Sequence, residues 1–305
     1  MNPHRHSFIV VLLSVLLGAC ATPASRPVSA PPATPAAMPV PAPAVSGPAP
    51  NDNLNAVAWS QTAIEHDLIY LEVYRDATDT LARALKDRSW DALAHADRSG
   101  PVRKLKPAII LDIDETVLDN SPYAARLVRA GKTHEDALWT QWCEEKAAKA
   151  LPGAREFTNF AAKHGVTVFY LSNRDTELNE VTLANLSSEG FPIAAGEKVF
   201  LGQGTDVPGC TPQGKSDKSC RRRLIGQRYR VLMQFGDQLG DFLEARPNTL
   251  AQRKAAVEPY LPWIGERWFV LPNPTYGSWE PALFGNDWKQ PPAQRRQEKL
   301  DNLRY

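Results

Sequence analysis

Three carboxylates directly after a short apolar segment are the first residues in the chain that suggest chemistry. The stretch Lys106–Tyr123 reads K-P-A-I-I-L-D-I-D-E-T-V-L-D-N-S-P-Y, and its acids include Asp112, Asp114 and Glu115. Residues 108–111 are apolar and partly β-branched, which favours a buried strand of a parallel sheet. Carboxylates at the end of such a strand repel one another unless a positive group lies among them. The sequence therefore predicts a hard cation, held by oxygen ligands, at this strand end.

Three further groups of polar residues follow apolar segments or lie in a nearby loop. They are Ser172 and Asn173 after residues 166–171, Lys215 and Lys218 in the basic loop 204–223, and Asp237 and Asp241 after residues 229–235. The carboxyl ends of parallel strands meet at one edge of a sheet, so these groups are expected to lie beside the first acids. Spacing alone does not decide between the two lysines.

The combined set has the parts that phosphoryl transfer requires. One carboxylate can attack phosphorus, and a second can give a proton to the leaving oxygen and later take one from water. A hydroxyl, an amide and an ammonium group can neutralise the phosphoryl oxygens, and Mg²⁺ can bridge phosphate and carboxylates. The set predicts a phosphoryl-transfer site with bound Mg²⁺.

The elements that must position these residues alternate between strand and helix, which is typical of a parallel sheet with helices on both faces. The predicted strands are residues 108–111, 166–171, 199–201, 229–235 and 267–271. The predicted helices are residues 53–85 with one break, a short helix that begins at 91–94, then 123–150, 154–164 and 177–188, while the charged tail 290–305 is either helical or loosely packed. The helical segment between the first two strands is expected to cap the strand ends. Its Trp139 and Trp142 either stack on a flat ligand or belong to the core.

The first 50 residues read as a targeting segment followed by a linker. Arg5 precedes an apolar run that is too short to span a bilayer stably, as in a secretory signal. Leu17-Gly18-Ala19-Cys20 resembles the bacterial lipobox, which implies acylation of Cys20; an ordinary signal peptide with an incidental cysteine is the alternative. Residues 21–50 contain 10 prolines and predict a disordered, partly polyproline spacer.

The composition is that of an ordinary folded protein. The chain has 305 residues, of which 43% are hydrophobic, and its 35 basic and 34 acidic residues nearly cancel. This balance indicates no nucleic acid polymer as a partner, and the six histidines lack the spacing of a zinc site. In an exported chain, Cys210 and Cys220 are close enough in sequence to form a disulfide, which leaves Cys143 as a free thiol. Residues 221–223, three arginines, are expected to form a solvated helix start.

The motifs resemble those of a known superfamily. D-I-D-E-T resembles the D-x-D-x-T motif of the haloacid dehalogenase (HAD) superfamily, L-S-N-R its second motif, the region of Lys218 its third and G-D-Q-L-G-D its fourth. Within it, residues 55–285 resemble the class C acid phosphatases, bacterial outer-membrane lipoproteins that hydrolyse phosphomonoesters; S-D-K-S-C-R-R-R and N-P-T-Y-G-S-W-E belong to the closer match. The resemblance implies an α/β fold, a HAD-like Rossmannoid parallel sheet flanked by helices, with a small helical cap.

The resemblance also implies roles for the first acids and the phosphate-binding groups. Asp112 would be the nucleophile and a metal ligand, and Asp114 the general acid and base, with its backbone carbonyl on the metal. Ser172 and Asn173 would hold the phosphoryl group. Lys218 would balance the charge of the phosphate and the nucleophile. It matches the family's lysine better than Lys215 does, because it directly precedes S-C-R-R as the family's lysine precedes its basic pair.

The remaining roles implied by the resemblance concern the metal and the alcohol part of the substrate. Asp237 would ligate Mg²⁺ directly and Asp241 would support the metal site, while Glu115 is expected to be structural. Some family members are 5′-nucleotidases, so Tyr276, with Trp139 or Trp142, is expected to stack on a nucleobase.

These interpretations divide the chain into three parts. Residues 1–19 would be a signal peptide, residues 20–50 the acylated Cys20 and its linker, and residues 51–305 the phosphatase domain, with a cap from about 53–100 and 120–152. The expected protein is a magnesium-dependent acid phosphatase on the outer membrane of a Gram-negative bacterium, facing the periplasm or the exterior. Its expected partners are a small phosphomonoester and, through the palmitate-type anchor on Cys20, the membrane. A homodimer is considered, but the sequence does not indicate the oligomeric state.

Two alternatives belong to other functional classes. The first is a non-catalytic surface lipoprotein that binds a nucleotide or cofactor; the presence of both Asp112 and Asp114 argues against it, since binding alone does not require a second acid two residues away. The second is a phosphotransferase that passes the phosphoryl group to another alcohol. The sequence does not separate this from hydrolysis, because both reactions use the same phosphoenzyme.

Overall fold

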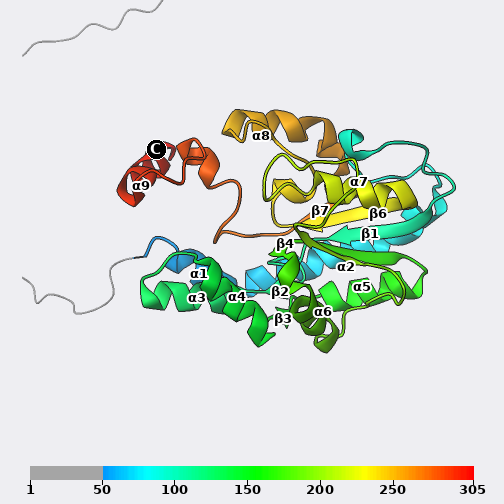
Figure 1. The fold of residues 1–305 in the computed structure, drawn as a ribbon, viewed down its shortest axis with the longest axis horizontal. Helices are drawn as coiled ribbons and strands as arrows, with labels where there is room; N and C mark the ends of the chain where they lie inside the picture. The colour runs from blue at the N-terminus through cyan, green and yellow to red at the C-terminus, as the bar shows by residue number, and fades with distance from the viewer. Residues whose placement is uncertain (1–50) are drawn as a thin grey trace, which may run out of the picture. The chain divides into compact units, whose positions relative to one another are not determined.

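A five-stranded parallel sheet lies at the centre of the computed structural model, which describes residues 51–305 (Figure 1). Its spatial order is β5-β4-β1-β6-β7, with all neighbours parallel. The strands are β1 (Lys106–Leu111), β4 (Thr167–Asp175), β5 (Phe200–Gln203), β6 (Tyr229–Gly236) and β7 (Trp268–Val270). The predicted α/β fold with a parallel sheet is confirmed. The chain order reverses between β1 and β6, and such a point is where open parallel sheets bind ligands.

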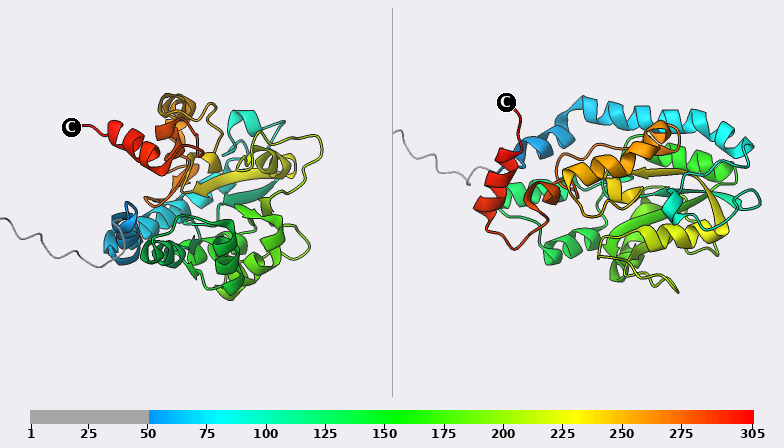
Figure 2. Two further views of the ribbon diagram at one scale, coloured as in Figure 1. Left: turned by 60° about the vertical axis from the view of Figure 1, so that its left-hand side comes forward. Right: turned by 90° about the horizontal axis from the view of Figure 1, so that it is seen from above.

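Helices cover both faces of the sheet because the side chains of β1 alternate between two apolar cores (Figure 2). Ile109 and Leu111 point to the core shared with α2 (Ile64–Lys86) and α5 (Ala154–Lys163). Ala108 and Ile110 point to the opposite core, which includes Ile225 from the helix that follows the basic loop. The other principal helices are α6 (Asn179–Ser188), α7 (Ser219–Arg228) and α8 (Leu250–Val257).

The first helical region breaks once, as predicted. Helix α1 (Leu54–Thr62) ends at Ala63, whose backbone is extended, and α2 begins at the next residue. The short helix expected from residues 91–94 is absent, and only the 3₁₀ turn η1 (His95–Asp97) forms there. The reason is that the backbone N–H of Ala92 donates to the Val231 carbonyl in β6, which fixes an extended chain. Helix α2 packs along the sheet, and its Tyr70 and Tyr74 hydroxyls donate to the Glu115 and Thr116 carbonyls just beyond β1.

The segment of residues 121–150, after β1, forms two helices where one helical stretch was predicted over 123–150. They are α3 (Ser121–Ala130) and α4 (Asp136–Glu145), and Gly131, in the left-handed conformation, ends α3. Two short antiparallel strands, β2 (Leu118–Asp119) and β3 (Lys149–Ala150), close the excursion. Helices α1, α3 and α4 gather at one end of the sheet (Figure 1). The division of the domain into cap and core stays a prediction.

The C-terminal region returns towards the start of the described chain. The 3₁₀ helices η4 (Glu258–Trp263) and η5 (Pro281–Phe284) flank β7 and lead to α9 (Pro292–Asp301), so the charged tail is helical. Arg296 of α9 donates to the Asp52 carboxylate at 2.8 Å. Within residues 51–305, none of the helices has the length and apolar character needed to cross a bilayer. The signal peptide, Cys20 and the linker lie outside the described residues.

Candidate active site

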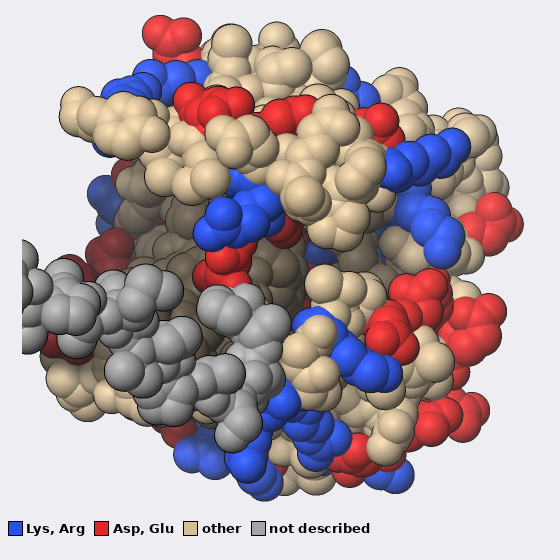
Figure 3. Space-filling model, turned by 90° about the vertical axis from the view of Figure 1, so that its left-hand side faces the viewer, with Lys and Arg blue, Asp and Glu red and all other residues tan. Residues whose placement is uncertain are grey.

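The structure brings the predicted polar groups together at the carboxyl ends of the central strands. Asp112 follows β1 directly, Ser172 lies in the last part of β4, and Asp237 follows β6. This edge opens towards the end of the molecule that carries α1, α3 and α9. Figure 3 shows a hollow there with acidic and basic side chains around it.

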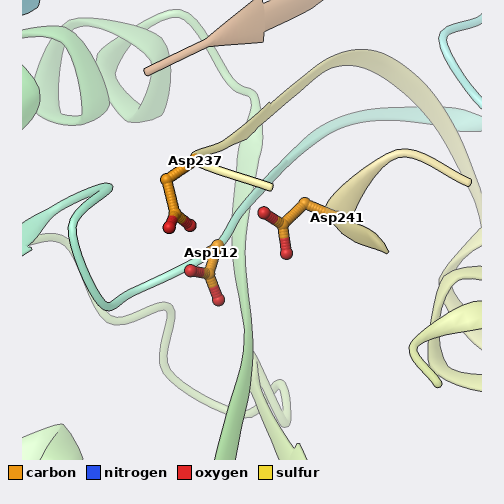
Figure 4. Close-up of side chains that lie close together, drawn as sticks. All are labelled: Asp112, Asp237 and Asp241. Atoms are coloured by element: carbon orange, nitrogen blue, oxygen red, sulfur yellow. The ribbon is translucent and has the colours of Figure 1, made fainter. Parts of the chain in front are cut away.

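Three buried carboxylates form the centre of the site. Oxygens of Asp112, Asp237 and Asp241 lie within 4.8 Å of one another, although Asp112 follows β1 and the other two follow β6 (Figure 4). Their exposures are 6%, 9% and 7%. Burial, followed by the Asp241 charge, raises the pKa of Asp237 well above its usual value. Burial likewise raises the pKa of Asp112 to about 7, against the opposing effect of the Lys218 ammonium.

This acidic group fits a divalent cation. Asp237 Oδ2 accepts a hydrogen bond from Asn273 Nδ2 at 2.7 Å, whereas the buried Asp237 Oδ1 has no hydrogen-bond partner within residues 51–305. An orphaned carboxylate oxygen beside two other carboxylates is costly unless a cation lies among them. Asp112, Asp237 and Asp241 supply the hard oxygen ligands that such a cation prefers. The Asp114 side chain is not part of this group.

Lys218 is the lysine that reaches the acids. Its Nζ, 3% exposed, donates to Asp112 Oδ1, to Asp241 Oδ1 at 2.7 Å and to the Leu171 carbonyl at 2.8 Å. Burial lowers the pKa of this ammonium, but the Asp112 and Asp241 carboxylates raise it by more, so the net pKa is raised. Lys215 lies in the exposed part of the preceding loop.

Asp114 is held by two residues that the sequence reasoning did not select. Its Oδ1 accepts from Arg174 Nε at 3.0 Å, from Arg174 Nη2 at 2.7 Å and from Asn120 Nδ2 at 2.9 Å. Its Oδ2 accepts from Ser172 Oγ at 3.1 Å. Strand β4 continues through Asp175, so Ser172 and Arg174, two apart, share one face. Extending the predicted strand by four residues would have indicated Arg174.

The two expected phosphate-binding residues of β4 differ in exposure. Ser172 is fully buried, and its Oγ also accepts from the Arg174 backbone N–H at 3.0 Å. Asn173 is exposed, and its Oδ1 accepts from Arg221 Nη2 at 3.1 Å. Arg221 in turn donates to the backbone carbonyls of Ser172 and Leu201. Arg221 therefore fixes the backbone at the end of β4.

The expectation that residues 221–223 form a solvated face is wrong for two of the three arginines. Arg221 is 3% exposed and Arg222 is fully buried, and carbonyl groups and the Asp97 carboxylate accept hydrogen bonds from their guanidinium groups. Among the described residues, only Arg222 Nη2 of these two groups is buried without a hydrogen-bond partner. Burial, followed by the charge of neighbouring Arg222, lowers the pKa of Arg221 to about 10. The third, Arg223, stays exposed at its side chain. A run of like charges gives no sequence signal for which members find partners.

Comparison with known proteins decides the family. The sequence model described as HAD superfamily, subfamily IIIB (acid phosphatase), matches residues 50–279. The chain belongs to this family.

Solved and curated relatives agree with that membership. The class C acid phosphatase from Bacillus anthracis is 34% identical, with 83% of this chain and 97% of that chain covered and a TM-score of 0.69; its structure with tungstate bound gives 0.70. Acid phosphatase 1 of Solanum lycopersicum is 29% identical over 55% of this chain and 57% of its own length. The stem 28 kDa glycoprotein of Glycine max is 30% identical over 56% and 60%. The chain thus spans less than two thirds of these two plant relatives.

A disulfide braces the loop before α7 in this member of the acid phosphatase family. Cys210 and Cys220 are bonded to each other, and Cys220 lies in the first turn of α7, two residues after Lys218. The bridge therefore ties the loop to the segment that presents the ammonium group. Cys143 is a buried free thiol.

The three aromatic residues expected to touch substrate have different surroundings. Trp142 is 2% exposed and donates from Nε1 to Asn120 Oδ1 at 2.7 Å, so a stacking role for Trp142 is wrong: it belongs to the core. Trp139 is half-buried and lies over the Arg174 guanidinium at 5.4 Å. Tyr276 is 37% exposed and donates its hydroxyl to Glu115 Oε2. Only Trp139 and Tyr276 of the three keep exposed ring surface beside the site.

Proposed function

We propose that the protein is a magnesium-dependent acid phosphatase that hydrolyses small phosphomonoesters through an aspartyl-phosphate on Asp112. The observation that carries the proposal is the buried Asp112 carboxylate in contact with Lys218 and beside the acids Asp237 and Asp241. Membership of the acid phosphatase family supports the same reaction class.

The side chains divide the reaction between them. An oxygen of Asp112 bonds to phosphorus, while Asp114 gives a proton to the departing alcohol oxygen. Asp114 then takes a proton from the water that attacks phosphorus, which releases phosphate and restores Asp112. Ser172, Asn173 and Lys218 hold the phosphoryl oxygens and balance their charge.

Magnesium is the cation that this proposal assigns to the acidic group. Asp112, Asp237 and Asp241 would hold it, with the backbone carbonyl of Asp114, and it would neutralise charge on the transferred phosphoryl group when bound. The orphaned Asp237 Oδ1 supports a cation at this place. Oxygen-only ligands favour magnesium over softer metals.

Nucleoside 5′-monophosphates are the proposed natural class of substrate. Trp139 and Tyr276 offer the aromatic surface on which a base would stack. The comparison of an adenosine monophosphate with glycerol phosphate tests this point: Tyr276→Ala is expected to raise KM about tenfold for the nucleotide and to leave glycerol phosphate unchanged. Equal effects on both substrates would contradict base stacking.

The central test is hydrolysis by matched carboxylate variants. Purified protein with Mg²⁺ is expected to release phosphate from p-nitrophenyl phosphate, and Asp112→Asn is expected to lower kcat on the order of 10⁴-fold or more. The control is Asp175→Asn, an exposed acid at the end of β4 that bonds only Gln203 among described side chains. Hydroxylamine trapping during turnover is expected to place a hydroxamate on Asp112, as mass spectrometry would show.

The result also separates the alternatives. An inactive wild-type protein that still bound a nucleotide would support a binding lipoprotein in place of an enzyme. Transfer of phosphate to added glycerol in preference to water would support a phosphotransferase. Wild-type turnover by the Asp112→Asn variant would contradict the proposed mechanism.

The proposed location is the outer membrane, by acylation of Cys20. Its basis is the lipobox-like tetrad of the sequence. Wild-type protein is expected in the membrane fraction, and Cys20→Ser in the soluble fraction. A membrane-bound Cys20→Ser protein would contradict the anchor.

A further inference from the structure

Arg174 is a buried cation that grips one oxygen of the Asp114 carboxylate. It lies at the carboxyl end of β4, is 1% exposed, and donates to Oδ1 through both Nε and Nη2. Asn120 Nδ2 donates to the same oxygen. Three donors on Oδ1 leave that atom no capacity for a further proton.

The other oxygen of Asp114 is much less committed. Oδ2 accepts from Ser172 Oγ at 3.1 Å, and Arg174 Nε is more distant at 3.4 Å. The Ser172 hydroxyl has a single proton to give. If that proton turns to a phosphoryl oxygen, as the proposed function requires of Ser172, Oδ2 loses its main partner. Oδ2 is therefore the oxygen free to carry a proton to the substrate.

Neighbouring side chains fix the orientation of Arg174 and Asn120, the two residues that donate to Asp114 Oδ1. Asn120 Oδ1 accepts from Trp142 Nε1 at 2.7 Å, which sets the direction of the amide. The Arg174 guanidinium also contacts Thr182 Oγ1 at 3.3 Å, and the Trp139 ring covers it. These partners come from α4, in the excursion after β1, and from α6, which follows β4, so both segments hold the arginine in place. A bidentate guanidinium held in this way has little freedom to turn.

We propose that Arg174 is a positioning residue for proton transfer: by holding Asp114 Oδ1 it directs the protonated Oδ2 at the oxygen of the leaving alcohol. The proposal rests on the proposed phosphatase function. As an oxygen of Asp112 bonds to phosphorus, the bond from phosphorus to the alcohol oxygen breaks and its electron pair stays on that oxygen, which takes the proton from Oδ2. Asp114 is left as a carboxylate, and Arg174 pairs its charge.

Proton donation has a signature that a purely structural role lacks. Nitro groups lower the pKa of a phenol, so the nitrophenol departs as its phenolate without receiving a proton. Unsubstituted phenol is a weaker acid, and its departure requires a proton from a general acid. The ratio kcat/KM covers the steps up to departure of the alcohol, and hydrolysis of the phosphoenzyme is common to all substrates. Loss of positioning should therefore slow poor leaving groups selectively.

The test compares Arg174 variants on aryl phosphates of similar shape. Arg174→Met is expected to lower kcat/KM about 100-fold for phenyl phosphate and less than about threefold for 2,4-dinitrophenyl phosphate. Arg174→Lys, which keeps the charge but not the two-nitrogen grip, is expected to lie between wild type and Arg174→Met. The matched control is Arg230→Met, which removes an equally buried guanidinium at the start of β6 that donates to the Ala84 and Asp87 carbonyls at the end of α2. It should affect both substrates equally.

Arg174→Lys and one further variant, Asn120→Ala, keep the proposal open to contradiction. If Arg174→Met does not fold, Arg174→Lys and Asn120→Ala decide, since each removes part of the same grip on Oδ1. An unchanged substrate ratio in the folded variants would show that Arg174 only stabilises the fold. Failure of the proposed function is a separate result: Asp112→Asn would then remain active on 2,4-dinitrophenyl phosphate.

Discussion

At the scale of single residues, the charge balance of the site depends on Lys218. Its ammonium contacts two of the three buried acids, Asp112 and Asp241, and also the backbone carbonyl of Leu171. A buried carboxylate group without this cation would carry an uncompensated charge, which is strongly unfavourable. Lys218 is thus expected to affect both the stability of the apo protein and the reaction.

Replacement of the two neighbouring lysines tests that expectation. Lys218→Met is expected to lower kcat/KM by about 10²- to 10³-fold, because it removes a cation from the position where phosphoryl charge develops. Lys215→Met is the control, because Lys215 lies in the exposed loop and should leave the rate unchanged. Steady-state kinetics with p-nitrophenyl phosphate measures both. Equal losses would mean that the loop, and not the ammonium, matters.

At the scale of elements, the sequence predicted strands more reliably than it predicted their side-chain partners. Runs such as Ala108–Leu111 are apolar on both sides and end in acids, so both the strand and the location of Asp112 were readable. Arg174 would have been indicated by a longer predicted strand, but its contact with Asp114 was not readable, and neither was that of Asn120, because no local pattern encodes contacts between separate segments. The burial of Arg222 depends in the same way on Asp97, which is 125 residues away.

The disulfide makes the loop before α7 a separate testable element. The double variant Cys210→Ser/Cys220→Ser is expected to lose about 2–3 kcal/mol of stability, because the bridge restricts the unfolded chain. Its kcat should also fall, because the bridge braces the segment that presents Lys218. Thermal unfolding and kinetics with and without dithiothreitol measure this. Dithiothreitol should shift the wild type towards the variant and leave the variant unchanged; sensitivity of the variant would contradict the assignment.

The start of α7 also predicts a pH dependence of stability. Burial raises the pKa of Asp217, but hydrogen bonds from Ser219 and from the Gln213 N–H lower it by more, so the folded pKa lies below its usual value. A lowered folded pKa adds stability above the unfolded pKa, and that stability is lost as the pH falls through the folded pKa.

Asp217→Asn is therefore expected to lower the free energy of unfolding by about 1 kcal/mol at pH 7, and by progressively less as the pH falls below about 4. Urea unfolding at a series of pH values gives the difference. Asp206→Asn, an exposed acid in the same loop, should show no such trend. A difference for Asp217→Asn that stayed constant at low pH would exclude the carboxylate as its cause.

At the scale of the whole molecule, the acidic group couples metal binding to folding. Asp112, Asp237 and Asp241 come from two segments that are adjacent only in the folded sheet, so a cation on all three binds the native state alone. Saturation at 100 times the dissociation constant would add about 2.7 kcal/mol to the free energy of unfolding.

Thermal unfolding measures this coupling without any assay of activity. Millimolar Mg²⁺ is expected to raise the Tm of the wild type by about 5 °C or more, and EDTA to reverse the shift. Asp237→Asn should lose most of the Mg²⁺ effect, whereas Asp175→Asn, outside the acidic group, should keep it. A shift that survives in Asp237→Asn would place the ion elsewhere.

The strand order has a consequence for the time at which the protein becomes active during its synthesis. Strand β1 is made first among the five but lies in the middle, and its partner on one side, β6, follows more than a hundred residues later. Lys218, Asp237 and the supporting Asn273 all arrive in this later part. A nascent chain that ends before residue 218 contains Asp112, yet it has neither the ammonium nor the remaining acids. The proposed phosphatase site is thus complete only when nearly the whole chain has emerged.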